Sequence, residues 1–525
     1  MNARTTLMFV LVLILATAAA CSPAAEAPDT GGGAIVIEEG GAVGSAPLPG
    51  SSDPIVGGDS GGAIEAPELE APGEAIVIGG SDGATSGEDS VGIVEEGSSG
   101  GVTDGGPVER TDEGAGEVFL GDSGDVIPVP LPEPGGDIII LPTAPSPNPQ
   151  PQSGLLTAAD IDDNLNYGAW QRYNESQTQY WNNNLGLPFI PTADRIAFRV
   201  VTAAGEPVSH AQLKFEWGMF NSVAGETGTN GMYYFYPAFD TGQTLTQFAV
   251  NARPVNGGSG VTVNVNMGQI DYDWNDIIQI TLPNASASLP MQADLMFVFD
   301  TTGSMGDELV YLTAEFRAIV DTVQQLYPQS DLRYGLILYR DDFDQYKVRN
   351  LGFTHSADEM QERLAQQEAN GGGDYPEAME AALREAVNAN WRSGNVARIM
   401  FLIADAPPHA ENYTAMVEQI GRARQAGIHI YPVAASGVAE EAEYLMRMGA
   451  ALTQGRYIWL TDDSGVGGAH AEPKVACYVV TRLDRLIVRV IESELAGRRV
   501  EPDYNEVIRS VGAYQNGVCM PDYQQ

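Results

Sequence analysis

The run Leu295-Met296-Phe297-Val298-Phe299 is followed directly by Asp300-Thr301-Thr302-Gly303-Ser304-Met305. Five consecutive apolar residues next to a turn-forming, oxygen-rich segment predict a buried strand that carries polar side chains at its carboxyl end. Four further apolar runs of strand length follow, with amphipathic segments between them, at residues 334–339, 399–404, 428–434 and 457–460. This alternation predicts an α/β domain with a mostly parallel, doubly wound sheet.

Three of these runs are followed at once by side chains that carry oxygen atoms. The three segments are Asp300-Thr301-Thr302-Gly303-Ser304-Met305, Arg340-Asp341-Asp342-Phe343-Asp344 and Asp405-Ala406-Pro407-Pro408-His409. A glycine-rich loop, Gly371-Gly372-Gly373-Asp374-Tyr375-Pro376-Glu377, precedes another helical pattern. Because ligands of doubly wound folds bind at the carboxyl ends of the strands, these segments contain the candidate ligand-binding residues.

The spacing Asp300-x-Thr302-x-Ser304 after an apolar strand resembles the metal-ion-dependent adhesion site of von Willebrand factor A (vWA) domains. The resemblance covers residues 291–496. The glycine-rich loop and the segment that begins with Asp405 resemble the subgroup found in alpha-kinase-associated and bacterial A domains. Carried over by position, the resemblance implies a metal site that consists of Asp300, Thr302, Ser304, Asp374 and Asp405.

Carboxylates and hydroxyls suit a hard cation. Mg²⁺ requires near-octahedral oxygen coordination, whereas thiols or imidazoles would indicate zinc. The resemblance implies that Thr302 and Ser304 bind the ion directly, that Asp300 and Asp405 bind through water, and that one position stays open for an acidic side chain of a protein partner. The expected cofactor is Mg²⁺, with Mn²⁺ or Ca²⁺ as alternatives.

Two other interpretations of the same residues stay open. Asp374 stands near the loop where adhesion-type A domains have Thr, and a carboxylate there would make the ion less electrophilic and weaken partner capture. Alternatively, Asp300 and Ser304 only cap a helix in a Rossmann-like domain that binds no metal, since Asp and Ser are common capping residues.

Residues 153–288 are expected to form a helical lead-in and a β-sandwich. Thr157 is expected to cap a helix that begins near Ala158. Short apolar and aromatic runs bounded by turn residues predict strands from residue 193 to 284. The pattern Gly205-x-Pro207-Val208, followed by Thr229-Asn230-Gly231, resembles transthyretin-like, carboxypeptidase regulatory-like domains, although many immunoglobulin-like modules share such turns. This resemblance implies a spacer or binding module.

Residues 1–20 have the features of an export signal. Arg4 precedes an apolar stretch, and Ala18-Ala19-Ala20 lies directly before Cys21. A Cys in this position resembles the lipobox of bacterial lipoproteins, which implies that Cys21 is lipidated and anchors the mature protein to a membrane. Ala18 stands where that family usually has Leu, so ordinary cleavage that leaves a free thiol is the alternative.

Residues 21–152 are rich in Gly and Pro and strongly acidic. From residue 22 onward they contain 24 Asp and Glu against the single basic residue Arg110, a net charge of −23. Such a composition buries too little apolar surface to offset chain entropy, so a disordered acidic tether is expected.

Two cysteines remain once Cys21 is set aside. Cys477 and Cys519 form a single pair that an oxidising compartment can join into a disulfide, with two unpaired thiols as the alternative. Cys519 belongs to residues 497–525, which are expected to be a C-terminal tail.

The overall charge of −43 argues against a nucleic-acid partner, because binding phosphates requires a basic patch. A Walker phosphate loop and an H-E-x-x-H zinc motif are both missing from the sequence, and no nucleophile–base pair is visible. The sequence therefore predicts an exported, lipid-anchored protein of a bacterial cell envelope, at the outer membrane or on the outer face of the cell membrane. It is expected to bind a partner through a divalent cation and not to be an enzyme. Alternatives are a metal-dependent enzyme or enzyme accessory, and a structural envelope protein whose metal is lost or only stabilising.

Overall fold

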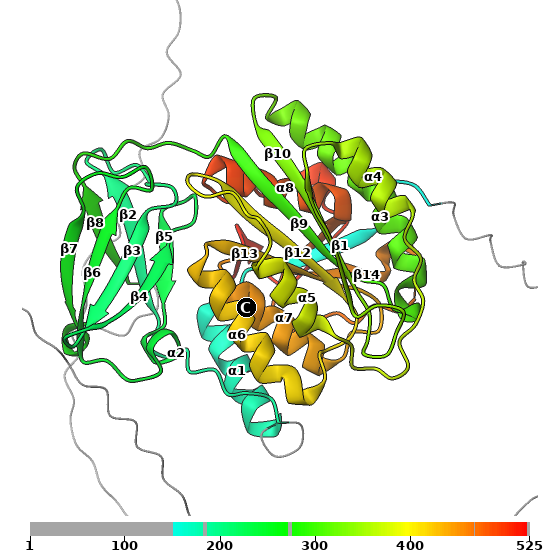
Figure 1. Cartoon of the computed structure of the whole chain (residues 1–525), viewed down its shortest axis with the longest axis horizontal. Coiled ribbons are helices and arrows are strands. Elements are labelled where there is room, and N and C mark those ends of the chain that lie inside the picture. Colours follow the sequence, from blue (N-terminus) through cyan, green and yellow to red (C-terminus); the bar gives the residue numbers. More distant parts are fainter. Residues whose placement is uncertain (1–150, 182–185, 271–275, 467, 522–525) are drawn as a thin grey trace, which may run out of the picture. The chain divides into compact units, whose positions relative to one another are not determined.

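A nine-stranded mixed sheet forms the centre of the computed structural model, which describes residues 151–181, 186–270, 276–466 and 468–521. The strand order is β11-β10-β9-β12-β13-β14-β1-β15-β16 (Figure 1). The strands are β1 (Thr157–Ile161), β9 (Gln292–Asp300), β10 (Asp331–Tyr339), β11 (Val348–Thr354), β12 (Ala397–Ala404), β13 (Ile428–Ala434), β14 (Tyr457–Thr461), β15 (Tyr478–Arg482) and β16 (Arg509–Val511). The predicted signal, Cys21 and the acidic tether lie outside the described residues.

Five consecutive strands of this sheet are parallel, from β10 through β9, β12 and β13 to β14. Each of the five apolar runs predicted as strands forms one of them. At the edges the sheet is mixed, because β11, β1 and β16 run antiparallel to their neighbours. The α/β fold predicted for this part of the chain is confirmed, with a mixed rather than purely parallel sheet.

Helices cover both faces of the sheet, as its strands require, because β12 and β13 are buried along their whole length. One face packs against α1 (Tyr167–Trp181), α5 (Met379–Val387), α6 (Tyr413–Gln425) and α7 (Glu440–Leu452). The other packs against α3 (Gly306–Leu326), α4 (Ala357–Ala365) and α8 (Leu483–Ala496). Local signals agree with this packing: Ser356 caps α4 by accepting a hydrogen bond from Glu359 N at 3.1 Å.

The prediction of a helix that begins near Ala158 is wrong. Residues 157–161 form β1, which lies between β14 and β15 and is buried at all five positions. The ladder satisfies the backbone of β1 on both sides, and this tertiary pairing outweighs the local helix signal of Thr157. A helix does follow, but it begins at Tyr167 and packs into the core of the large sheet.

Two smaller sheets are inserted between α1 and β9, and residues 196–282 are called the small-sheet module below. One contains β5 (Met232–Phe235), β2 (Ile196–Thr202) and β8 (Ile277–Leu282) in that order, and the other β4 (Asn221–Glu226), β3 (Gln212–Trp217), β6 (Gln247–Arg253) and β7 (Val261–Asn266). Alternate residues of both sheets form one core, with Phe198, Phe215, Phe235 and Phe248 in ring contact. A short helix, α2 (Pro237–Thr241), and the 3₁₀ turn η1 (Met267–Gln269) complete the module.

The small-sheet module contacts the part of the chain that contains the large sheet through buried and partly buried polar and charged groups, called the seam below. Arg424 Nε donates to Asp240 Oδ1 at 2.8 Å, and Arg398 Nη1 donates to Glu226 Oε1 at 2.7 Å. Thr229 Oγ1 donates to Glu494 Oε2 at 3.4 Å. The seam residue Arg398 lies at the amino end of β12, the end opposite to the one where the candidate ligands are expected.

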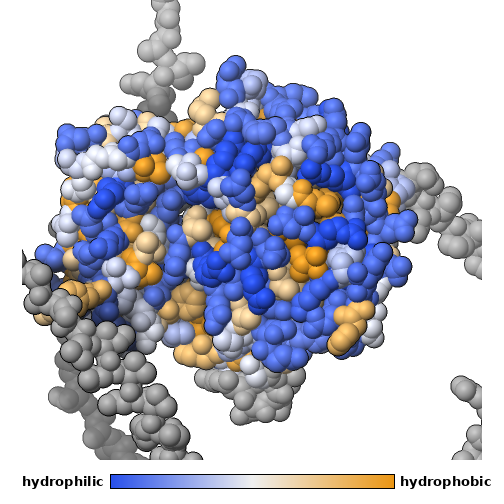
Figure 2. All heavy atoms as spheres, viewed as in Figure 1, coloured by the Kyte–Doolittle hydropathy of each residue, from blue (hydrophilic) through white to orange (hydrophobic). Residues whose placement is uncertain are grey.

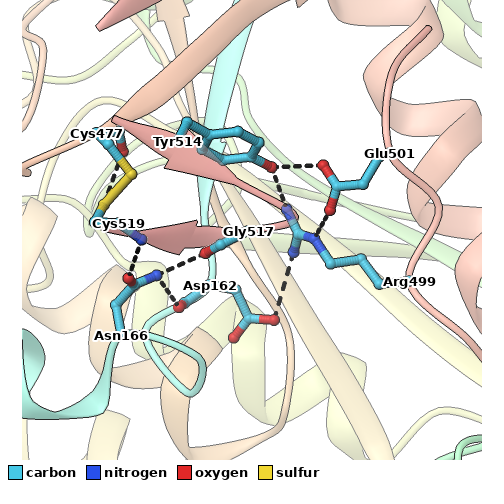
Figure 3. The surroundings of a disulfide bond; sticks show 8 residues. All are labelled: Asp162, Asn166, Cys477, Arg499, Glu501, Tyr514, Gly517 and Cys519. Carbon is cyan, nitrogen blue, oxygen red and sulfur yellow. Dashed lines mark hydrogen bonds and ion pairs between the residues drawn. A yellow bond between two sulfur atoms is a disulfide. The ribbon is translucent and has the colours of Figure 1, made fainter. Parts of the chain in front are cut away.

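The predicted pairing of Cys477 with Cys519 is confirmed, and the disulfide joins residues 42 positions apart (Figure 3). Cys519 N also donates to Asn166 Oδ1 at 2.8 Å, and Asn166 Nδ2 donates to Gly517 O at 2.7 Å. The end of the chain forms a hairpin of β17 (Tyr514–Gln515) and β18 (Val518–Cys519). The disulfide therefore fastens this hairpin to the segment that leads into β15.

The surface in Figure 2 is mainly hydrophilic, and its hydrophobic residues form small separate patches. Among the helices of the described residues, none is both long enough and apolar enough to cross a membrane.

Candidate metal-ion site

The loop after β9 brings three of the expected site residues together. Asp300 Oδ1 accepts hydrogen bonds from Thr302 N at 2.9 Å and from Thr302 Oγ1 at 2.7 Å. Thr302 Oγ1 lies 3.3 Å from Ser304 Oγ. An aspartate at a strand end commonly binds the backbone two residues on, and this turn leads into η2 (Gly303–Met305) and then α3. The two hydroxyls and the carboxylate therefore share one short loop.

Asp405 comes close to this loop because β12 lies next to β9 and runs parallel to it. Asp405 follows the last residue of β12 directly, and both aspartates are buried. Burial first, and then the charge of Asp405, raise the pKa of Asp300 to about 7. Asp300 Oδ2 is buried without a hydrogen bond of normal length, although the nearby Tyr339 hydroxyl interacts with this carboxylate and lowers its pKa. A cation beside these groups would favour their charged form.

Asp374 differs from Asp300 and Asp405 in its exposure to solvent. Its side chain is exposed on the glycine-rich loop, and its charge acts on His409. The loop itself packs against the first one, since Gly303 N donates to Gly371 O at 3.1 Å. Gly371 and Gly372 both have positive φ, at 84° and 71°, which a side chain would disfavour.

Glu377 is the residue of this loop that turns inward, and the sequence interpretation did not select it. Its side chain is 3% exposed, and its Oε2 has no hydrogen bond within the described part of the chain. A Cβ built on Gly372 would lie 2.7 Å from Glu377 Oε1 and 3.3 Å from Thr302 Cβ, so both side chains meet at this glycine. Burial, then Asp300 and the other nearby carboxylates, raise the pKa of Glu377 to about 9.

More acidic groups form the rim of the site. Asp344 Oδ2 accepts from Gly372 N at 2.9 Å and from Asp341 N at 3.1 Å. His409 Nε2 lies 2.7 Å from Asp341 Oδ1. Burial alone would lower the pKa of His409, but Asp341 outweighs it and raises that pKa. The rim carboxylates thus hold the surrounding loops in place.

The donor set fits a hard divalent cation in chemical type, because every candidate atom is a carboxylate or hydroxyl oxygen. Within the described ranges, no three His, Cys, Asp or Glu side chains are spaced to hold one ion by themselves. A cation site here would therefore need the hydroxyls of Thr302 and Ser304 as ligands in addition to the carboxylates. In the resemblance to vWA domains, those two hydroxyls are the direct ligands.

Comparison with known proteins identifies the α/β part of the chain. Residues 294–465 match the family model described as von Willebrand factor A domain. The chain therefore contains a vWA domain, as the spacing Asp300-x-Thr302-x-Ser304 predicts. Domains of this kind often mediate protein–protein interaction.

Curated relatives are similar to the chain over part of its length. The alpha-protein kinase vwkA of Dictyostelium discoideum is 28% identical over 145 residues, which are 27% of this chain and 23% of that protein. The von Willebrand factor A domain-containing protein 7 of Rattus norvegicus is 31% identical over 138 residues, which are 25% of this chain and 14% of that protein. The chain thus spans less than a quarter of the length of these relatives.

Two solved structures are also similar. BatB, a conserved hypothetical protein from Bacteroides thetaiotaomicron, is 14% identical with a TM-score of 0.29, and the match covers 38% of this chain and 98% of that one. The vWF domain of the type V pili tip protein Mfa5 from Porphyromonas gingivalis is 11% identical with a TM-score of 0.27, and the match covers 41% of this chain and 99% of that one.

Proposed function

We propose that this protein binds a protein partner through a divalent cation held by Asp300, Thr302, Ser304 and Asp405. The observation that carries the proposal is the buried Asp300 carboxylate, which holds the Thr302 hydroxyl 3.3 Å from that of Ser304 and leaves one of its own oxygens without a hydrogen bond of normal length. Buried polar atoms normally find partners, so an orphaned carboxylate oxygen beside two hydroxyls favours a bound cation.

The proposed chemistry is binding rather than catalysis. Mg²⁺ is the expected ion, because it accepts oxygen ligands in octahedral geometry and keeps several waters. An acidic side chain of the partner would replace one such water. Asp374 is exposed on the glycine-rich loop. A carboxylate that bound the ion from this position would weaken the attraction between the ion and the partner's acidic side chain.

Titration calorimetry of Mg²⁺ and Mn²⁺ into the full chain tests this proposal. We expect saturable binding that is lost in Asp300→Ala, because this change removes the carboxylate that orders Thr302. Asp503→Ala, which removes an exposed carboxylate on the segment after α8, is the control and should bind the ion as the wild type does. Equal affinity in Asp300→Ala and the wild type would refute the site.

We further propose that the protein is exported and anchored to a bacterial envelope membrane through lipid on Cys21, with residues 21–152 as a tether. The support is the small-residue sequence Ala18-Ala19-Ala20 before Cys21 and the acidic, Gly- and Pro-rich composition that follows. Cells that express the protein are grown with a clickable palmitate analogue. Label is expected on the wild type and not on Cys21→Ser, and equal labelling of both would contradict the anchor.

A further inference from the structure

We propose that Glu377 is a direct ligand of the cation and occupies the coordination position that a partner's carboxylate would otherwise take. The inference rests on the proposed cation site and assigns to it a carboxylate three residues beyond Asp374. It makes the site self-capped, so that a partner has to displace Glu377 in order to reach the ion.

Burial and contact distinguish Glu377 from Asp374. Glu377 is 3% exposed with an unsatisfied Oε2, whereas the side chain of Asp374 is exposed to solvent. Glu377 Oε1 and the Thr302 side chain both lie next to Gly372, where a Cβ would come within 2.7 Å of the glutamate oxygen and 3.3 Å of Thr302 Cβ. A carboxylate that is buried with an orphaned oxygen next to the hydroxyl-bearing loop is stabilised in its charged form by a positive partner.

The backbone around Glu377 is fastened to the other loops of the site. Glu377 N donates to Pro407 O at 2.9 Å, and this contact ties it to the segment that begins with Asp405. Ala378 N donates to Arg340 O at 3.2 Å, next to the rim residue Asp341. The backbone at Glu377 is therefore fastened to the loops that follow β10 and β12.

The side chain must still move to reach the ion. As they stand, the carboxylates of Asp300, Asp405 and Glu377 are not spaced to hold one ion on their own. Glutamate has three side-chain torsions, and Glu377 Oε2 has no hydrogen bond to break. A cation next to the Thr302 hydroxyl would attract Glu377 Oε2, because opposite charges attract strongly in a buried setting.

A third carboxylate changes what the site does. With Asp300 and Asp405 alone, two negative charges balance the cation, and its open position attracts an acidic group from outside. With Glu377 bound, three carboxylates surround the divalent ion, so the site has a net negative charge and its open position is filled from within. Cation binding then becomes tighter, while capture of an acidic partner becomes a competition with Glu377.

Two measurements on the full chain with Mn²⁺ as the probe test this inference. Calorimetry gives the affinity, and relaxation of bulk water protons gives the number of exchangeable waters on the bound ion. We expect Glu377→Gln to weaken Mn²⁺ binding roughly tenfold or more, because one charge next to the ion is removed. We also expect the ion in this variant to gain one exchangeable water.

Asp374→Asn is the matched control, because it removes a carboxylate from the same loop. It should keep the affinity and the water number of the wild type. Equal values for Glu377→Gln and Asp374→Asn would overturn the inference, and so would a loss of affinity confined to Asp374→Asn. Glu377→Met, which keeps the side-chain volume, replaces Glu377→Gln if the latter does not fold.

The two proposals fail in different ways. If the wild type binds no Mn²⁺, the cation site itself is refuted, and the role of Glu377 falls with it. If the wild type binds Mn²⁺ and Asp300→Ala does not, while Glu377→Gln behaves like the wild type, the cation site stands and only the self-capped arrangement is refuted.

Discussion

Phe343, near the candidate site, has a strained backbone conformation. Its φ of 72° lies in the left-handed region, and its side chain is fully exposed, so no packing compensates for the strain. The turn is held by Asp344, whose carboxylate accepts from Asp341 N and Gly372 N. The strain at Phe343 is therefore imposed by contacts that position the loops around the site.

Replacing Phe343 with Asn should stabilise the protein. Asn tolerates positive φ better than Phe, so we expect Phe343→Asn to raise the free energy of unfolding by about 0.5–1 kcal/mol. Chemical denaturation of both proteins measures the difference. Phe220→Asn is the control, because Phe220 is also exposed but does not have a positive φ. An equal gain in both variants would show that removal of exposed apolar surface, and not backbone strain, is responsible.

The residue pattern indicated that Asp300, Thr302 and Ser304 share one loop, but it did not single out Glu377, which we propose as a third carboxylate of the site. Asp300, Thr302 and Ser304 are close in the sequence, and their spacing within one turn is enough to bring their side chains together. Asp374 and Glu377 lie three positions apart on one loop, and no local pattern decides which of them turns inward. That choice depends on positive φ at Gly371 and Gly372 and on the bond from Glu377 N to Pro407, which is 30 positions away.

Strands built from continuous apolar runs were predictable, whereas β1, which has no such run, was not. β12 and β13 are apolar along most of their length and buried on both faces, so composition alone identifies them. β1 contains Ala158, Ala159 and Asp160, and it becomes a strand only because β14 and β15 offer pairing on both sides. Its neighbours in the sheet are about 300 positions away, beyond the range of any local pattern.

The disulfide is an element-scale constraint on the end of the chain. Cys477 precedes β15 and Cys519 lies in β18, so the bond closes a loop across α8 and β16. From the loop length, chain entropy gives an upper limit of about 4 kcal/mol for its contribution to stability. We expect the double variant Cys477→Ser and Cys519→Ser to lower the unfolding temperature, as measured by calorimetry.

Reductant provides the control for this prediction. It should lower the unfolding temperature of the wild type toward that of the double variant and leave the variant unchanged. A wild type that is unaffected by complete reduction would mean that the hydrogen bonds of Asn166 hold the hairpin without the disulfide.

At the scale of the whole described region, the seam and the candidate site lie at opposite edges of the large sheet. Asp300 and Asp405 lie at the carboxyl ends of parallel strands, whereas Arg398 and His429 lie near the amino ends of β12 and β13. The small-sheet module therefore packs away from the proposed cation site. The turn signals in the sequence predicted strands in this module, but its seam depends on charged pairs that join distant segments.

A buried pair of His429 and Glu494 lies at the seam and makes the stability of the protein depend on pH. His429 Nδ1 lies 2.6 Å from Glu494 Oε1, and Tyr431 OH donates to the same oxygen at 2.6 Å. Burial alone would lower the pKa of His429 and raise that of Glu494, but the attraction between them outweighs burial. The pKa of His429 is raised, and that of Glu494 falls to about 2. Glu226 and Arg398, of opposite charge, also act on His429.

The sign of the pH dependence follows from these directions. The raised pKa of His429 means that its contribution is complete below its ordinary value of 6.5 and is lost as the pH rises through the folded-state pKa. The lowered pKa of Glu494 means that its contribution is complete above 4.5 and is lost as the pH falls toward about 2. The pair therefore stabilises the seam most between pH 4.5 and 6.5.

We expect the free energy of unfolding of the wild type to fall more steeply from pH 6 to pH 9 than that of His429→Gln, as measured by denaturation at each pH. At pH 6 the variant should be less stable by roughly 1–3 kcal/mol, because it leaves the buried Glu494 without its cation. His355→Gln is the control, since His355 is exposed and pairs only with the exposed Asp331 among the described residues, and it should keep the wild-type slope. If His429→Gln keeps that slope as well, the pH dependence arises elsewhere, and the seam is held by Arg424 and Arg398 alone.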